Sequence, residues 1–207
     1  MRYTLLLVAL IFVGFFIQLM SSDVAALVNT YGFSTSGLLE RPYILITSIF
    51  LHGGVEHLLG NILVLVFFGL AVESELGKGK YLLIFFLGAF AGDLLSIIAF
   101  APADVSIGAS AGIFALIGAG MLVKPVDISL IMPIPIAFVG MLYAIYNVYG
   151  FISGTPSNVS YVGHFGGLFT GLAFGVHHAG WKRSLLIVGV TLLIMVIVPV
   201  VWLLFFA

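Results

Sequence analysis

The strongest constraint on the fold is that charged and turn residues divide this sequence into seven long apolar stretches. They cover approximately residues 4–20, 55–72, 81–101, 108–123, 128–150, 160–178 and 184–206. A helix needs about 20 apolar residues to cross the hydrocarbon of a bilayer, so most stretches are long enough, and 108–123 is short. A transmembrane β-barrel would instead alternate apolar and polar residues over segments of about 10 residues. The pattern therefore predicts an all-α, polytopic membrane helical bundle.

The low charge of the chain excludes a water-soluble protein of this length. Hydrophobic residues make up 62% of the 207 residues and charged residues only 7%, whereas a soluble domain carries about 25% charge. The net charge is −1, so the composition gives no basic surface for nucleic acid. The sequence contains no Cys, which excludes disulfides, a thiolate nucleophile and a Cys-based metal site.

The basic residues predict how the bundle is oriented. If the N-terminus is cytoplasmic, a single basic residue, Arg41, lies in a predicted outer segment. The other basic residues then lie in inner segments: Arg2, Lys78, Lys80, Lys124, Lys182 and Arg183. Cytoplasmic loops carry an excess of Lys and Arg. We therefore expect an integral, multi-pass protein of the cell membrane, with a cytoplasmic N-terminus and an outer C-terminus.

Two connections between the apolar stretches are unusual. Segment 21–54 is long and mixes aromatic residues with Ser, Thr and Gly, so we expect it to lie at the outer interface rather than to cross the membrane. Segment 151–159 lies between Gly150 and the sixth stretch and contains Gly154 and Pro156. We expect this second connection to act as a lid that opens for water and substrate.

Several polar side chains fall inside the apolar stretches, where the absence of water makes each of them costly. They are His57, Asn61, Asp93, Ser110 and His164. Counted from the nearest cytoplasmic boundary at 1.5 Å per residue, Ser110 lies roughly 21 Å, His57 roughly 24 Å, Asn61 roughly 18 Å and His164 roughly 25 Å deep. Three stretches therefore bring polar groups to one level, below the outer face of a core about 30 Å thick.

Ser110 begins the short fourth stretch, within the sequence Gly108-Ala109-Ser110-Ala111-Gly112. A helix N-terminus offers free backbone N–H groups and the positive end of the helix dipole, which suits a developing oxyanion. Taken alone, however, a Ser at this place is more often a helix N-cap.

His164 is the natural base for such a serine, because no other His lies deep in a later stretch. Glycines follow both residues: Gly112 and Gly118 after Ser110, and Gly167 and Gly171 after His164. Small helix faces allow close approach, so these glycines are expected to bring Ser110 and His164 within hydrogen-bond reach, besides serving ordinary helix packing.

His57 and Asn61 are spaced i, i+4 and share one helix face. They are candidates for an oxyanion hole if that face meets Ser110, and otherwise form a buried polar pair between helices. His52 lies off that face, and we expect it to have a structural role at the outer interface.

Together these residues resemble the rhomboid family of intramembrane serine proteases. The resemblance covers about residues 4–178, with motifs in the second, fourth and sixth stretches. They are H-x-x-x-x-H-L-x-x-N from His52 to Asn61, the segment from Gly69 to Gly77 that closes the second helix, the start of G-x-S-G at Gly108-Ala109-Ser110, and H-x-x-G-x-x-x-G from His164 to Gly171. Each motif alone is weak, but their order makes them jointly specific.

The resemblance implies a six-helix protease core over residues 1–178, followed by a cytoplasmic turn and a seventh transmembrane helix over 179–207. It implies a Ser–His dyad without a third acidic member, in which Ser110 is the nucleophile and His164 the base. The oxyanion would be held by the Ser110 backbone N–H and the side chains of His57 and Asn61. Substrates would be transmembrane proteins in the lipid bilayer, and no cofactor or metal is implied.

Three features depart from the family pattern. Ala111 follows the nucleophile where the family has Gly, and its methyl group could crowd the oxyanion site. Phe114 stands where many members carry a Tyr that stacks under the catalytic His. Tyr43-Ile44 occupies the place of a Trp-Arg pair in the first loop, which puts the anchoring of that loop in question.

Other classes of protein fit the residues less well. An intramembrane aspartyl protease needs paired acids, and Asp93 is alone and lacks the G-x-G-D pattern. A zinc protease needs H-E-x-x-H spacing, which segment 52–57 does not have. A transporter is disfavoured because the two halves show no inverted repeat of broken helices. The remaining alternative is a rhomboid-like pseudoenzyme that binds transmembrane helices without cutting them; such proteins usually lack the Ser or the His.

Overall fold

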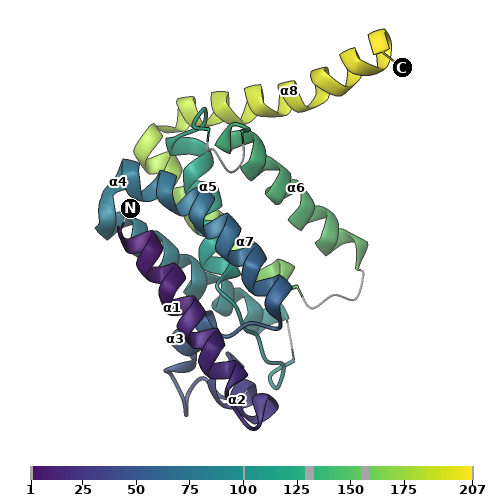
Figure 1. The fold of residues 1–207 in the computed structure, drawn as a ribbon. Coiled ribbons are helices and arrows are strands. Elements are labelled where there is room, and N and C mark those ends of the chain that lie inside the picture. Colours follow the sequence, from purple (N-terminus) through teal and green to yellow (C-terminus); the bar gives the residue numbers. More distant parts are fainter. Residues whose placement is uncertain (1, 100, 129–132, 155–158, 207) are drawn as a thin grey trace.

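The computed structural model describes residues 2–99, 101–128, 133–154 and 159–206, and Figure 1 shows that this part of the chain is built from helices. In chain order they are α1 (Arg2–Leu19), α2 (Val24–Tyr31), α3 (Ile44–Thr47), the 3-10 helix η1 (Ser48–Phe50), α4 (Val55–Ala99), α5 (Ser110–Val123), α6 (Ile136–Ser153), α7 (Tyr161–Ala179) and α8 (Trp181–Phe206). The prediction of an all-α polytopic bundle is confirmed.

The seven predicted stretches correspond to α1, two limbs of α4, and α5 to α8. The limbs of α4 meet at Gly77, where φ is 77°, a conformation that glycine adopts without steric cost. Among the described residues, α1, α4, α6 and α8 are long and apolar enough to cross a membrane, and α5 is a shorter apolar helix. These helices support an integral, multi-pass membrane protein.

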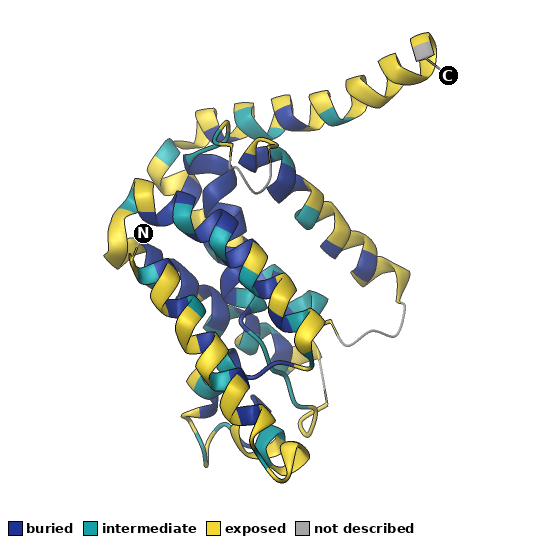
Figure 2. Cartoon of the chain, viewed as in Figure 1, coloured by how far each residue is buried: buried dark blue, intermediate teal, exposed yellow. Residues whose placement is uncertain are grey.

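Helix α5 occupies the centre of the bundle, and every one of its residues after the first two is buried (Figure 2). Glycines on its neighbours make this possible. A Cβ on Gly167 or Gly171 of α7 would collide with the carbonyl oxygen of Ala111 or Ala115, respectively. On the α4 side, a Cβ on Gly88 would collide with the side chain of Ala115. The expected close approach of small helix faces is thus confirmed, and it explains how a 14-residue helix is enclosed by protein.

Helix α1 is attached to α4 and to the loop before it by polar contacts at both of its ends. In its first turn, the Glu73 carboxylate accepts hydrogen bonds from the backbone N–H groups of Tyr3 (3.1 Å) and Thr4 (2.9 Å) and from the Thr4 hydroxyl (2.7 Å). A carboxylate is favourable there because helix N-termini carry free N–H groups and a positive dipole end. In its last turn, the Gln18 side chain donates to the His52 carbonyl (2.7 Å) and accepts from the His52 N–H (3.0 Å). These bonds fix the loop from which the first limb of α4 begins.

Replacing Gln18 by Leu is expected to lower the melting temperature. The buried N–H and C=O of His52 would both lose their partner, and each unsatisfied buried group costs about 1–3 kcal/mol. Thermal unfolding in detergent measures the loss, with Ile17→Ala as the control, because Ile17 is the exposed neighbour of Gln18 on α1. Equal melting temperatures for Gln18→Leu and wild type would show that the two bonds do not hold this loop.

Segment 21–54 lies at the end of the bundle opposite α8 (Figure 1). Its helices α2 and α3 have 8 and 4 residues, too short to cross a membrane, as expected. Phe33 and Ser106 form an isolated antiparallel bridge with N–H···O distances of 2.9 and 2.8 Å. The Gly108 N–H also donates to the Ser48 carbonyl at 2.9 Å. This segment therefore positions the loop that leads into α5.

Helix α8 leaves the bundle after α7 and extends away from it (Figure 1), and its described side chains are exposed or half-buried except Ser184 and Thr191 (Figure 2). The expected division at residue 178, with a seventh transmembrane helix after it, stays a prediction. Of the expected lid, 151–159, residues 155–158 lie outside the described residues.

Candidate active site

Ser110 is the first residue of α5, His164 lies in the first turn of α7, and their side chains meet where the two helices touch. Ser110 Oγ lies 2.9 Å from His164 Nε2. The N-cap of α5 is Ala109, which makes no side-chain capping bond. The interpretation of Ser110 as an N-cap is therefore wrong: its hydroxyl bonds to an imidazole, and the N-terminal N–H groups of α5 carry no side-chain cap.

A single cavity of about 1430 Å³ contains all four residues that the sequence singled out for catalysis. Its walls come from α4, α5, α6, α7 and the loops before α4 and α5, and include His57, Asn61, Asp93, Ser110, Tyr143 and His164. Pockets for small molecules usually have about 300–1000 Å³. This cavity is larger and has room for an extended stretch of polypeptide beside Ser110.

His57 and Asn61 converge on Gly108, two residues before Ser110. A Cβ on Gly108 would lie 2.8 Å from His57 Cε1, 3.1 Å from His57 Nε2 and 3.7 Å from Asn61 Nδ2. Gly108 also has φ +121°, a backbone conformation that residues other than glycine rarely adopt. This glycine therefore leaves a space between two polar side chains of α4 and the start of α5.

Each of the two polar side chains beside this space has a hydrogen-bond donor available. His57 Nδ1 accepts a hydrogen bond from the Gly53 N–H at 3.3 Å, so a neutral His57 carries its proton on Nε2. Asn61 Nδ2 is buried and has no hydrogen-bond partner within the described part of the chain. Buried donors are rarely left unpaired, so Asn61 needs an explanation.

His52 is fully buried behind His57, with ring centroids 5.0 Å apart, and it does not line the cavity. Burial, and secondarily the neighbouring His57, lower the pKa of the His52 imidazole to about 4. His52 is therefore neutral at neutral pH. Its position agrees with the structural role expected for it.

Comparison with known proteins identifies the family of the chain. The family model for the rhomboid domain matches residues 39–181, which is more than half of the chain. The chain belongs to the rhomboid family. It is 30% identical over 146 residues to rhomboid-related protein 2 of Mus musculus, covering 66% of this chain and 48% of that protein. It is 34% identical over 140 residues to the rhomboid protease GluP of Bacillus subtilis (strain 168), covering 66% of this chain and 27% of that protein.

A shorter match is closer in sequence. RHOMBOID-like protein 1 of Arabidopsis thaliana is 44% identical over 75 residues, covering 36% of this chain and 19% of that protein. The chain thus spans less than half the length of each of these three relatives.

Two departures from the rhomboid pattern are accommodated by their neighbours. The Phe114 ring stacks on His164, with centroids 4.1 Å apart and an interplanar angle of 14°. It therefore supports the imidazole without a hydroxyl group. The Ala111 methyl group faces Gly92 of α4, where an added Cβ would lie 2.6 Å from it. Glycine at position 92 provides the space that the additional methyl group requires.

The third departure concerns the first loop, which is anchored by other residues. Arg41 Nη1 donates to the carbonyls of Asn29 and Thr30, both at 3.0 Å. Ile44 is fully buried, and the rings of Tyr43 and Tyr31 lie 6.0 Å apart. A Trp-Arg pair is therefore not needed to attach this loop.

Asn147 was not among the residues predicted for the site, but it contacts His164 directly. Its Oδ1 lies 2.9 Å from His164 Nδ1, on the opposite side of the ring from Ser110. The available signal was a polar residue within the fifth apolar stretch. Asp93, one of the polar residues inside the apolar stretches, lies in the cavity wall, and it has no hydrogen-bond or ion-pair partner among the described residues.

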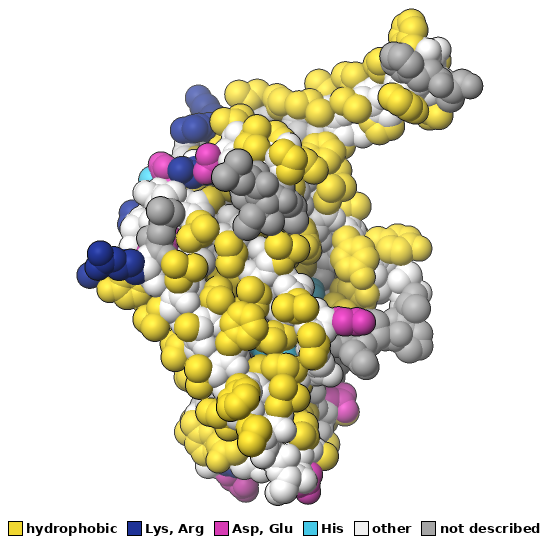
Figure 3. Space-filling view, in the orientation of Figure 1, with side chains coloured by type: hydrophobic (Ala, Val, Ile, Leu, Met, Phe, Trp, Pro, Cys, Tyr) yellow, Lys and Arg dark blue, Asp and Glu magenta, His cyan; other side chains and the backbone are white. Residues whose placement is uncertain are grey.

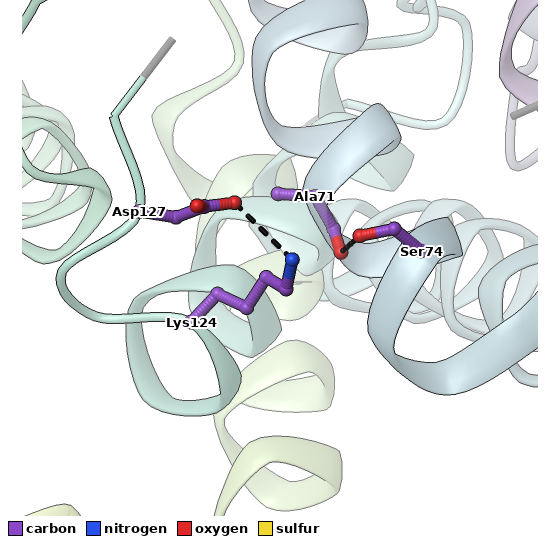
Figure 4. Close-up of polar contacts among 4 residues, drawn as sticks. All are labelled: Ala71, Ser74, Lys124 and Asp127. Carbon is purple, nitrogen blue, oxygen red and sulfur yellow. Dashed lines mark hydrogen bonds and ion pairs between the residues drawn. The ribbon is translucent and has the colours of Figure 1, made fainter.

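A second, smaller cavity of about 180 Å³ lies between α4 and the segment that joins α5 to α6. Near it, Lys124 Nζ lies 3.3 Å from an Asp127 carboxylate oxygen, and the Ser74 hydroxyl donates to the Ala71 carbonyl at 2.8 Å (Figure 4). Neither pair combines a nucleophile with a base. Within the described ranges, no group of three His, Asp or Glu residues is arranged to hold a metal ion.

Proposed function

We propose that this chain is an intramembrane serine endopeptidase that hydrolyses peptide bonds in or near the transmembrane segments of membrane proteins. The observation that carries the proposal is the 2.9 Å contact between Ser110 Oγ and His164 Nε2, inside a large cavity of a bundle built from apolar helices. A serine hydroxyl bonded to an imidazole is the arrangement of an activated nucleophile. Membership of the rhomboid family supports the same reaction.

In the proposed reaction, Ser110 Oγ attacks the carbonyl carbon of the scissile peptide bond while its proton passes to His164 Nε2. Collapse of the tetrahedral intermediate breaks the C–N bond, and His164 gives the proton to the leaving amine. Water then attacks the acyl-enzyme, again losing a proton to His164. Release of the new carboxyl group returns the proton to Ser110 and restores both residues.

The negative charge of the tetrahedral intermediate would be stabilised by the Ser110 backbone N–H, His57 Nε2 and Asn61 Nδ2. Three observations support these donors: Ser110 begins a helix, His57 accepts at Nδ1, and Asn61 Nδ2 is buried without a partner among the described residues. Donors that are fixed before the reaction stabilise the transition state without reorganisation. The unpaired Asn61 amide is then explained as a donor kept for the oxyanion.

Replacing Asn61 by Leu is expected to lower kcat about 10²–10³-fold, the usual effect of removing one oxyanion donor. Because Asn61 Nδ2 bonds to no described group, the same change should leave the melting temperature equal or raise it. Kinetics and thermal unfolding of one preparation measure both effects. A loss of activity that parallels a loss of stability would contradict the oxyanion role. Leu63→Ala, at an exposed position two residues further along α4, is the control.

The proposed topology places the N-terminus in the cytoplasm, the C-terminus outside and the dyad below the outer face of a cell membrane. In Figure 3 most of the Lys and Arg side chains in view gather at the upper left, where α1 and α8 begin (Figure 1). Basic residues are retained on the cytoplasmic side. The proposed substrates are transmembrane proteins that reach the cavity from the lipid bilayer.

Cleavage in proteoliposomes tests the proposal. The purified protein is reconstituted with a single-span substrate that has small residues near the outer end of its helix, and products are identified by mass spectrometry. We expect two fragments with wild type and none with Ser110→Ala. Co-purification of intact substrate with wild type, without fragments, would instead identify a pseudoenzyme that binds transmembrane helices.

A further inference from the structure

The Asn147 side chain links α6 to two residues of α7 in the candidate site. It is fully buried. Its Nδ2 donates to the Tyr161 carbonyl of α7 at 3.0 Å, and its Oδ1 lies 2.9 Å from His164 Nδ1. Both the NH₂ group and the oxygen of the amide therefore make a hydrogen bond.

The Tyr161 carbonyl determines which way the amide points. A carbonyl oxygen only accepts hydrogen bonds, so the NH₂ group of Asn147 must face Tyr161 and the amide oxygen must face His164. The amide oxygen in turn only accepts, so His164 Nδ1 must carry the proton. A neutral imidazole has one protonated nitrogen, which leaves Nε2 with a free lone pair 2.9 Å from Ser110 Oγ.

We propose that Asn147 is a positioning residue that holds His164 in the tautomer able to accept the Ser110 proton. The inference rests on the proposed function. When His164 becomes an imidazolium, its Nδ1–H still donates to Asn147 Oδ1, so the same bond stabilises the protonated base. Asn147 thus supplies, with a neutral amide, the orientation that the acidic member supplies in a Ser–His–Asp triad.

A purely structural role is the competing explanation, because Asn147 also attaches α6 to α7. In the last two turns of α6, Asn147 and Gly150 are the buried residues, and a Cβ on Gly150 would collide with the Tyr161 ring. Gly150→Ala therefore disturbs the same attachment without touching the bond to His164. It is the matched control for loosening α6.

The experiment measures the rate of labelling by a fluorophosphonate as a function of pH for wild type, Asn147→Leu, Asn147→Asp, Gly150→Ala and Val148→Ala. Asn147→Leu removes the acceptor, and we expect labelling about 10²-fold slower. Asn147→Asp keeps an acceptor and adds a negative charge that favours the imidazolium. We expect this variant to be labelled at least about tenfold faster than Asn147→Leu. We also expect its acid midpoint, the pH at which acidification halves the labelling rate, to rise by about one pH unit.

The controls separate positioning from packing. Gly150→Ala is expected to lower the melting temperature and to keep the acid midpoint of wild type, and the exposed neighbour Val148→Ala is expected to match wild type in both. Labelling of Asn147→Leu within threefold of wild type would overturn the inference. So would equal losses for the Leu and Asp variants with an unchanged midpoint. If folded wild type is not labelled, the proposed function fails and the inference fails with it.

Discussion

Replacing Ser110 or His164 by Ala is expected to abolish peptide-bond cleavage in proteoliposomes, with a loss of about 10⁴-fold or more for either variant. The hydroxyl supplies the nucleophile and the imidazole removes its proton, so each residue is ineffective without the other. The two residues are 54 positions apart in the chain and meet through one hydrogen bond. The double variant should therefore be no slower than either single variant, because residues that act as a unit are not additive.

Matched controls exist for both substitutions. Ser184→Ala removes a hydroxyl from α8 whose one hydrogen-bond partner among the described residues is the carbonyl of Gly180. His177→Ala removes an exposed imidazole from the same helix as His164, near its other end. Both controls should retain full activity. Residual cleavage by Ser110→Ala at a tenth of the wild-type rate or more would assign the nucleophile to another residue.

Gly167→Val is expected to disrupt the core and to abolish activity, although residue 167 carries no functional group. Its Cβ would collide with the carbonyl oxygen of Ala111, the residue after the nucleophile. Backbone cannot rotate away as a side chain can, so α5 and α7 would have to separate. We expect a cost of about 3 kcal/mol or more, and a widened gap between Ser110 and His164.

The control for Gly167→Val is Gly189→Val on α8, where an added Cβ would have no described heavy atom within 4 Å apart from its chain neighbours and its own helix backbone. The measurements are melting temperature in detergent and labelling by a fluorophosphonate. Gly167→Val should have a lower melting temperature than wild type and should not be labelled. Gly189→Val should match wild type in both measurements. Wild-type labelling by Gly167→Val would show that close packing of α5 against α7 is not what brings the dyad together.

Much of the fold could be predicted because its determinants are local. Each apolar stretch carries its own hydropathy signal, and the glycines after Ser110 and His164 mark the faces where helices approach. The rhomboid motifs then indicated which polar side chains share one cavity. The cavity does contain His57, Asn61, Ser110 and His164.

What could not be predicted depends on contacts between distant segments. Asn147 lies close to the C-terminal end of its apolar stretch, where an Asn needs no buried partner, so only the packing of α6 against α7 reveals its contact with His164. The N-cap interpretation of Ser110 was locally reasonable, and a contact with another helix decides against it. The space for Ala111 comes from Gly92, which lies 19 residues earlier on α4.

Labelling by a fluorophosphonate, followed by mapping of the modified peptide, is the most direct test that Ser110 is an activated nucleophile. Wild type, Ser110→Ala and His164→Ala are treated side by side after each has been shown to be folded. We expect one adduct, on Ser110, in wild type alone. No adduct in any of the three folded proteins, or an adduct on a different serine, would contradict the proposed protease and favour a helix-binding pseudoenzyme.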